Sequence, residues 1–358
     1  MLSLLVASPF DRSVPDGRLQ LTQPPTASET TNYSPARGRR VLDRAPATGT
    51  AYWTRLPDPV LSPRKRPLLV WTGEEVLVFG GGGRRDGAAW SPDRRRWRHL
   101  PVAPAPLRTN IAVWTGDEAV ILTPAATLLY RPDRDAWEQT PGPPPGLLAE
   151  DRSMGDATIL GEEVVVVGSG AQAAAVYDLR RHRWRPLAVP SPADFVDTPA
   201  VITHGSRVAV LGDTSQGSVG WSMSLEDDGA RPLPTNPWPP DAPELSWFRA
   251  VASAGDRFVI AQNSTQATRA AVLRASGWRP LPNVSGLAQH PIVVGINAGV
   301  VVWSSEVGRG AIYRRSAAAW QEIDPAPLLT SAGAGVAMGN QFFLWNERHA
   351  AVWTPGRS

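Results

Sequence analysis

The sequence predicts an all-β fold, a β-propeller of seven blades with four antiparallel strands in each blade. Three observations lead to this prediction. Apolar runs ending in glycine return at intervals of 40 to 50 residues, a second apolar run follows each of them, and an aromatic residue with a spaced tryptophan ends most of the units. Units of this length that hold four strands are typical of propeller blades.

The first strand of each unit is an apolar run that ends in glycine. The seven runs end at Gly73, Gly116, Gly161, Gly205, Gly255, Gly299 and Gly339. One or two residues later a second run begins, such as VLVFGG in the first unit and EVVVVGSG in the third. Two short apolar runs joined by a turn predict a β-hairpin, so we expect these runs to be the two inner strands of each blade.

The two outer strands are predicted from pairs of aromatic residues that have six residues between them. The pairs are Trp90 with Trp97, Tyr130 with Trp137, Tyr177 with Trp184, and Tyr313 with Trp320. The segments between them, such as SPDRRR and RPDRDA, contain Pro, Asp and Arg, which suit an exposed turn. Each unit is therefore expected to hold four strands.

The two ends of the chain are predicted to share the last blade. Only TPGRS follows Trp353, which is too short to reach another tryptophan strand. The segment TAYWTRLPDP around Trp53 matches RRWRHLPVAP around Trp97. We therefore expect the N-terminal strand near Trp53 to complete the seventh blade and close the ring.

These repeats resemble the kelch family of propellers over about residues 51–358, through the glycines Gly80–Gly81 after the second strand and the spaced aromatics. The copies are uneven, since Thr123–Pro124 replaces the glycine pair in the second unit and Ala230 stands where the fourth tryptophan is expected. The resemblance implies a fold of the galactose-oxidase-like superfamily. Its copper site is excluded, because radical copper oxidases of that family need a cysteine crosslinked to tyrosine and this chain has no cysteine.

Residues 51–358 are predicted to form a single domain, and residues 1–50 a leader. MLSLLVASPF has the apolar character of a signal peptide without a preceding basic residue, and the segment after it is rich in Pro, Thr, Ser and Arg. We expect a disordered tether, with a truncated export signal as the sharper interpretation. An exported bacterial protein, extracellular or attached to the cell envelope, is expected, with a cytoplasmic protein as the alternative. No apolar run of membrane-spanning length is present.

The stretch GGGGRRDGAAWSPDRRRWRHLP, residues 80–101, allows three interpretations: a phosphate loop, a nucleic-acid patch, or one repeat of the propeller. A phosphate loop needs a following helix, and none is predicted here. Lys65 is the only lysine among 36 basic residues, the net charge is only +3, and carboxylates lie between the arginines. We therefore expect no nucleic-acid partner and favour the repeat.

Catalytic signals are few. His99, His182 and His204 fall on outer strands or tight turns, while His290 and His349 are expected on one face, where isolated histidines are more often solvated than ligands. We expect no cofactor and no metal site. A sugar epimerase is left open, because two well-placed side chains would suffice for its chemistry.

The expected site is the face formed by the loops that link successive blades. Its candidate ligand-binding residues are Arg64, Arg108, Asp151, Arg152, Asp197, Trp247, His290 and Arg309. Three of the arginines, Arg64, Arg108 and Arg152, lie at equivalent positions before the first-strand glycine of their repeats. The alternative to ligand binding is that these arginines hold neighbouring blades together. We expect a monomeric, non-catalytic binding module that presents this face to a protein, a peptide or an acidic glycan. The alternative is a carbohydrate-active enzyme of the epimerase, mutarotase or lyase type at the channel mouth.

Overall fold

The computed structural model consists of β-strands and loops in the part of the chain that it describes, with no α-helix there. The described residues are 50–109, 111–148, 155–168, 174–188, 199–204, 206–214, 217–225, 230–233, 245–253, 258–264, 267–274, 277–285, 291–314, 319–328 and 333–356. The predicted leader falls, apart from residue 50, outside these residues. The all-β prediction is confirmed, and within the described ranges no helix could span a membrane.

The first three sheets are each built from four strands that follow one another along the chain. Sheet one contains β2 (Leu68–Trp71), β3 (Val76–Phe79), β4 (Gly87–Ser91) and β5 (Arg96–Leu100). Sheet two contains β6 (Ala112–Trp114), β7 (Ala119–Leu122), β8 (Ala126–Arg131) and β9 (Ala136–Pro141). Sheet three contains β10 (Gly155–Leu160), β11 (Glu163–Gly168), β12 (Ala174–Asp178) and β13 (Arg183–Pro186).

The next three sheets repeat this plan. Sheet four contains β14 (Ala200–His204), β15 (Arg207–Thr214), β16 (Gly217–Met223) and β17 (Arg231–Pro232). Sheet five contains β18 (Leu245–Ser253), β19 (Phe258–Ser264), β20 (Ala267–Arg274) and β21 (Gly277–Pro280), and β22 (Val284–Ser285) also pairs with β20. Sheet six contains β23 (Ile292–Ile296), β24 (Gly299–Ser304), β25 (Arg309–Arg314) and β26 (Ala319–Ile323).

A further sheet, which we call the closing sheet, joins the two ends of the described chain. It contains β27 (Gly333–Met338), β28 (Gln341–Asn346), β29 (His349–Thr354) and, on its outer edge, β1 (Tyr52–Arg55). Trp53 lies directly opposite Trp353 in the antiparallel register. The expected pairing of the strand near Trp53 with the last repeat is therefore present.

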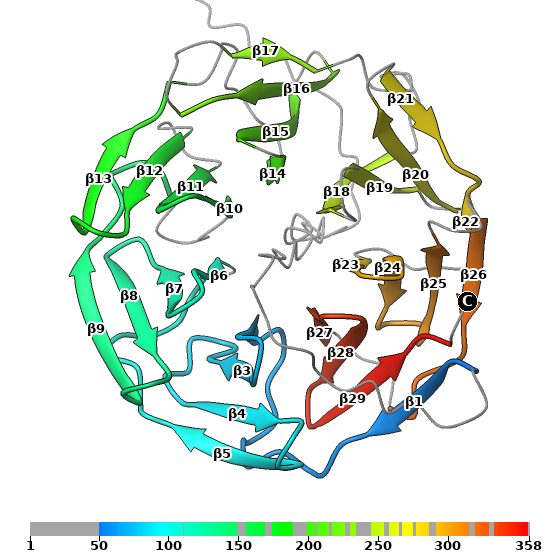
Figure 1. Cartoon of the computed structure of the whole chain (residues 1–358), viewed down its shortest axis with the longest axis horizontal. Coiled ribbons are helices and arrows are strands. Elements are labelled where there is room, and N and C mark those ends of the chain that lie inside the picture. Colours follow the sequence, from blue (N-terminus) through cyan, green and yellow to red (C-terminus); the bar gives the residue numbers. More distant parts are fainter. Residues whose placement is uncertain are drawn as a thin grey trace, which may run out of the picture.

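The sheets surround a common centre, with the first strand of each sheet inward and the last strand outward (Figure 1). Neighbouring sheets contact one another through their innermost strands. These contacts join β2 with β6, β6 with β10, β10 with β14, β14 with β18, β18 with β23, β23 with β27, and β27 with β2. The fold is a β-propeller, as the sequence predicts.

Burial on both faces explains why the inner strands read as continuous apolar runs. All four residues of β3 and of β7 are buried, because each sheet is covered by a neighbouring sheet on either side. The outer strands are largely open to solvent instead: β5 is exposed at Arg96, half-buried at Trp97 and buried only at Leu100. A strand that is half in solvent needs only one apolar face, which explains the arginines beside the tryptophans.

The paired aromatics face each other across the two outer strands. Trp90 lies opposite Trp97 and Tyr130 opposite Trp137, with ring centroids 5.3 Å and 5.1 Å apart. The pairs of Tyr177 with Trp184 and of Tyr313 with Trp320 repeat this register. The spacing of six residues thus reflects a strand, a tight turn and a return strand.

In five of the sheets, the part of the chain that the structure describes shows the outer tryptophan also joining its sheet to the one before it, a role that the repeats in the sequence do not indicate. The indole N–H donates to a backbone carbonyl four residues beyond the equivalent tryptophan of the preceding sheet. The bonds are Trp97 to Pro57 (2.8 Å), Trp137 to Pro101 (2.9 Å), Trp184 to Pro141 (3.1 Å), Trp320 to Pro282 (2.8 Å) and Trp53 to Asp324 (2.7 Å). The closing sheet therefore makes the same kind of bond as sheets one, two, three and six.

Candidate functional site

The strand order places two kinds of loop at the same end of every sheet. In an antiparallel meander, the loop between the second and third strands lies beside the connection from the fourth strand to the next sheet. We call this end the loop face and the opposite end, with the short hairpin turns, the turn face. For sheet one, the loop face carries residues 80–86 between two connections, residues 56–67 and 101–111.

Arg64 lies in the first of these connections, and its guanidinium is completely buried. Two of its nitrogens bind the carboxylate of Asp86 in the loop of residues 80–86, at 3.0 Å and 2.8 Å. The same group donates to the carbonyls of Ser62 and Gly80, at 2.9 Å and 3.1 Å. Because protein acceptors surround this guanidinium, Arg64 fits the structural alternative rather than ligand contact.

The backbone of Arg64 bonds to the closing sheet. Its N–H donates to the carbonyl of Glu347 (2.9 Å), and its own carbonyl accepts from the indole of Trp345 (3.2 Å). The hydrogen bonds from Arg64 also hold the pKa of Asp86 below its ordinary value, against the opposing effect of partial burial. One residue therefore ties sheet one to the closing sheet and keeps Asp86 charged.

The loop of residues 80–86 begins with glycines for a geometric reason. Gly80 and Gly81 have φ angles of +61° and +90°, which side-chain-bearing residues rarely adopt. A Cβ at Gly80 would lie 2.8 Å from the Cβ of Leu107, and one at Gly81 would lie 3.0 Å from the carbonyl oxygen of Lys65. The two connections press on the loop from both sides, so the glycine pair permits this close approach.

Further hydrogen bonds hold the loop against both connections. Arg84 donates to the hydroxyl of Ser62 (2.9 Å), and Arg85 donates through its Nε to the carbonyl of Ala103 (2.6 Å). The Ala103 N–H returns a bond to the Arg85 carbonyl (2.8 Å). Both arginines are nevertheless exposed. The backbone of this loop is thus held in place while its cationic side chains face solvent.

Arg108, from the second connection, is also exposed and lies across Gly83. A Cβ at Gly83 would be 3.1 Å from both the Cγ and the Nε of Arg108. The structure therefore brings Arg64 and Arg108 to the same loop in different environments, one buried and one at the surface. Their equivalent positions in the sequence do not indicate which of the two arginines is buried and which is exposed.

The other predicted site residues are not joined to this loop by a described contact. Arg309 begins β25 on the loop face of sheet six and is exposed. The backbone of Trp247 lies in β18, and its side chain is outside the description. Asp151, Arg152, Asp197 and His290 lie outside the described residues.

The loop face also carries four exposed cations that were not among the candidate ligand-binding residues: Lys65, Arg84, Arg85 and Arg348. The signal for two of them was the Arg-Arg pair directly after the glycine run, in a stretch that was interpreted as part of one propeller repeat. Lys65 lies 3.5 Å from the carboxylate of Glu347, the residue before Arg348. Their grouping depends on contacts between loops that are far apart in the sequence.

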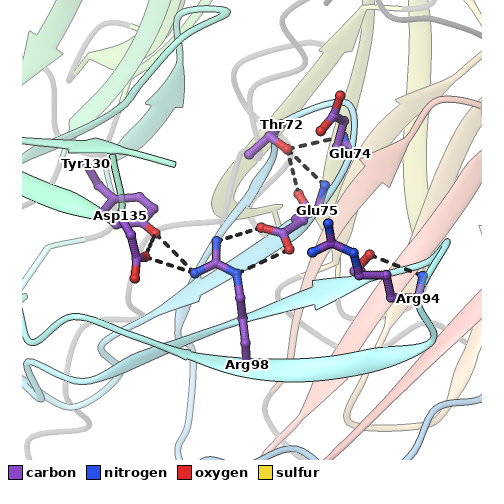
Figure 2. Close-up of polar contacts among 8 residues, drawn as sticks. Thr72, Glu74, Glu75, Arg94, Arg98, Tyr130 and Asp135 are labelled. Atoms are coloured by element: carbon purple, nitrogen blue, oxygen red, sulfur yellow. Dashed lines mark hydrogen bonds and ion pairs between the residues drawn. The ribbon is translucent and has the colours of Figure 1, made fainter. Parts of the chain in front are cut away.

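The turn face uses its charges differently, as Figure 2 shows for sheets one and two. Arg98 on β5 lies between Glu75 and Asp135, with N–O distances of 2.7 Å and 2.9 Å. Tyr130 donates to the same Asp135 oxygen at 2.6 Å. The bond to Glu75 raises the pKa of Arg98, and burial raises that of Tyr130. These groups connect sheets one and two by hydrogen bonds and ion pairs, and we do not interpret them as a catalytic acid and base.

A histidine–carboxylate pair lies on the loop face. His349 Nδ1 is 3.1 Å from Asp58 Oδ1, and Arg55 lies within 3.1 Å of the same ring nitrogen. His349 begins β29 and Asp58 follows β1, so the pair lies at the ends of the outer strands of the closing sheet, whereas the enzymatic alternative places its site at the channel mouth. Among the described residues, no group of three or more His, Asp or Glu side chains could hold a metal ion.

Asp156 is a buried carboxyl between two innermost strands. Its oxygens accept from the N–H of Ala157 (2.9 Å) and from the N–H of Val201 on β14 (2.8 Å). Burial raises the pKa of Asp156 to about 7, which outweighs the opposite effect of these two hydrogen bonds. The carboxyl therefore joins sheets three and four and is expected to bind its proton well above the ordinary pH range of Asp.

We expect Asp156 to make the protein less stable as the pH rises from about 4 to about 7. The unfolded chain ionises near the ordinary pKa of 3.8, while the folded protein keeps the proton until about 7. The contribution of this group is therefore complete below pH 3.8 and is lost as the pH rises, by at most about 1.4 kcal/mol per pH unit. Urea unfolding at stepped pH should show a smaller decline for Asp156→Asn. Asp133→Asn, at a highly exposed position, is the control; equal slopes for the wild type and Asp156→Asn would contradict the assignment.

The fold and the loop-face geometry define a β-propeller, and solved structures of other proteins share this architecture. Hydrazine synthase of Kuenenia stuttgartiensis is 12% identical, with 80% of this chain and 95% of that chain covered and a TM-score of 0.56. A fungal alcohol oxidase of the AA5 family, in complex with copper, is 13% identical, with 86% and 76% covered and a TM-score of 0.62. At these identities the likeness concerns the fold alone. No protein-family model and no curated protein matches the sequence.

Proposed function

We propose that this chain is a kelch-type binding module without catalytic activity that presents its loop face to a protein, a peptide or a glycan. The observation that carries the proposal is the loop of residues 80–86, whose backbone is held by both neighbouring connections while Arg84 and Arg85 stay exposed. A surface that is already ordered can bind without a further loss of loop entropy. Propellers commonly place function on such loops, which a rigid scaffold holds in position.

We further propose that the closing sheet acts as a seventh blade, so that the ring of sheets is closed without a gap. Two observations support this. Trp53 lies opposite Trp353 just as Trp97 lies opposite Trp90, and the indole of Trp53 donates to sheet six. A ring closed by its own N-terminal strand keeps the loops of the closing sheet and of sheet one in a constant relative position.

The binding proposal is tested by mapping a ligand onto one of the two faces. The full-length protein is screened against peptide and glycan arrays, and each ligand found is titrated against two variants. Arg108→Glu changes the loop face, and Arg134→Glu makes the matched change on an exposed turn of the turn face. We expect only Arg108→Glu to weaken binding. Binding lost in Arg134→Glu alone, or chemical conversion of the ligand seen by mass spectrometry, would contradict the proposal.

A further inference from the structure

A group of exposed cations covers the loop face where the closing sheet, sheet one and sheet two meet. We call it the cation cluster, and its members are Lys65, Arg84, Arg85, Arg108 and Arg348. The contacts described above connect them: Arg84 reaches Ser62 beside the buried Arg64, and Arg108 lies across Gly83 in the loop that contains Arg84. Lys65 approaches Glu347, next to Arg348. The cluster therefore extends across loops from three sheets.

Basic residues outnumber acidic ones in the segments that carry this cluster. Segments 62–66, 80–86 and 347–348 and residue 108 contain seven basic and two acidic residues. Asp86 binds the buried Arg64, and Glu347 faces Lys65. These segments therefore carry an excess of basic residues, in a chain whose net charge is only +3.

The glycine run adds backbone donors at the centre of the cluster. Gly81, Gly82 and Gly83 have φ angles of +90°, +65° and +78°, and their N–H groups donate to no backbone carbonyl within the described residues. No atom lies within 4 Å of a Cβ built on the exposed Gly82. Successive backbone N–H groups in such turns attract anions. The arginines can bind the same oxygens with paired N–H donors.

From this arrangement, and resting on the proposed binding function, we propose that the cation cluster binds an anionic polysaccharide through its carboxylate or sulfate groups. A linear chain with repeated anions can engage several separated cations at once, which one small anion cannot. The surface around the cluster is polar. The exposed large apolar side chains among the described residues are three valines, two of which, Val60 and Val102, lie singly in the flanking connections. A hydroxyl-rich glycan suits this surface better than a peptide that relies on apolar contacts.

The test measures binding of labelled oligosaccharides to the full-length protein by fluorescence anisotropy. The probes are a heparin oligosaccharide, an oligogalacturonate, a polyglutamate peptide and a neutral dextran oligosaccharide. We expect at least one of the first two to bind more tightly than polyglutamate and dextran, with affinity that falls steeply between about 0.05 M and about 0.5 M salt. Equal or tighter binding of polyglutamate would overturn the glycan assignment in favour of an acidic peptide.

Two pairs of charge reversals place the site. Arg84→Glu with Arg108→Glu should weaken binding of the anionic glycan by about tenfold or more, because each lost contact involves a charge-assisted hydrogen bond. The matched control, Arg95→Glu with Arg134→Glu on the turn face, should leave it unchanged. Lys65→Glu with Arg348→Glu tests the same surface without touching the loop of residues 80–86, so it distinguishes lost binding from lost folding. Unchanged affinity in both loop-face pairs would overturn the inference.

Failure of this inference can be told apart from failure of the proposed function. If neither anionic glycan binds, but another array ligand is lost in Arg108→Glu, the loop face binds a different partner and only the glycan inference fails. If every ligand found maps to the turn face, both proposals fail.

Discussion

Replacing Trp53 with alanine is expected to lower the free energy of unfolding by about 3–5 kcal/mol, about as much as Trp97→Ala. The indole of Trp53 packs edge-on against Trp303 and Phe342, with centroid distances of 5.0 Å and 6.0 Å, and donates to the carbonyl of Asp324 at 2.7 Å. The substitution removes both the packing and the bond between the closing sheet and sheet six. Denaturant unfolding followed by tryptophan fluorescence and circular dichroism measures the change.

Two controls separate these effects. Trp53→Phe keeps an aromatic ring but loses the N–H donor, so it should cost less, with about 1 kcal/mol of the loss assigned to the hydrogen bond. Thr54→Ala, at the exposed next position of β1, should change stability by about 0.5 kcal/mol or less. A deletion of residues 1–57 that leaves stability unchanged would show that β1 does not close the ring, whereas deletion of residues 1–49 removes no described strand.

Arg64→Ala is expected to destabilise the protein by about 3 kcal/mol, because it leaves the partners of a buried charge without their donors. The carboxylate of Asp86 and the carbonyl of Gly80 both bind this guanidinium. Arg108→Ala, at the equivalent but exposed position, should change stability by about 0.5 kcal/mol or less. Thermal and urea unfolding of the two variants measure the difference.

The acid side of the stability profile provides a second readout for Arg64. The folded-state pKa of Asp86 lies below its ordinary value, so the pair stabilises the protein above that value and the stabilisation is lost as the pH falls through the folded-state pKa. In Arg64→Ala this loss should be smaller. If Arg64→Ala keeps full stability and loses only ligand binding, Arg64 belongs to the binding surface instead.

Much of the fold could be predicted from the sequence because each repeat carries local signals. The continuous apolar runs of β3 and β7 reflect burial on both faces, and the six-residue spacing of Trp90 from Trp97 reflects a hairpin. The pairing of Trp53 with Trp353 was predictable because the end of the chain lacks a strand that its beginning supplies. The indole bonds between sheets were not predicted, although a proline or an aspartate lies four residues after each of the equivalent tryptophans.

The binding surface was only partly predictable. The face was inferred from the chain connections, and Arg108, one of the residues named for it, lies in the connection between β5 and β6. Arg64 lies at the equivalent position and is buried, while Arg84 and Arg85 stand in a stretch that was interpreted as part of a repeat. The position of an arginine within its connection does not indicate whether its long side chain turns inward to a carboxylate or outward to solvent.

The sequence by itself determined that this protein is a repeated, all-β, cysteine-free chain whose aromatic residues pack between strands, because strand periodicity and turn chemistry act over a few neighbouring residues. Only the tertiary structure decided which charges are internal and which are presented. The bonds of Arg64 to Asp86, of Arg98 to Asp135 and of Trp345 to Arg64 join segments 22, 37 and 281 residues apart. Burial of a charge depends on such distant partners, since the free energy of removing it from water must be offset by groups that only the folded ring brings within hydrogen-bonding distance.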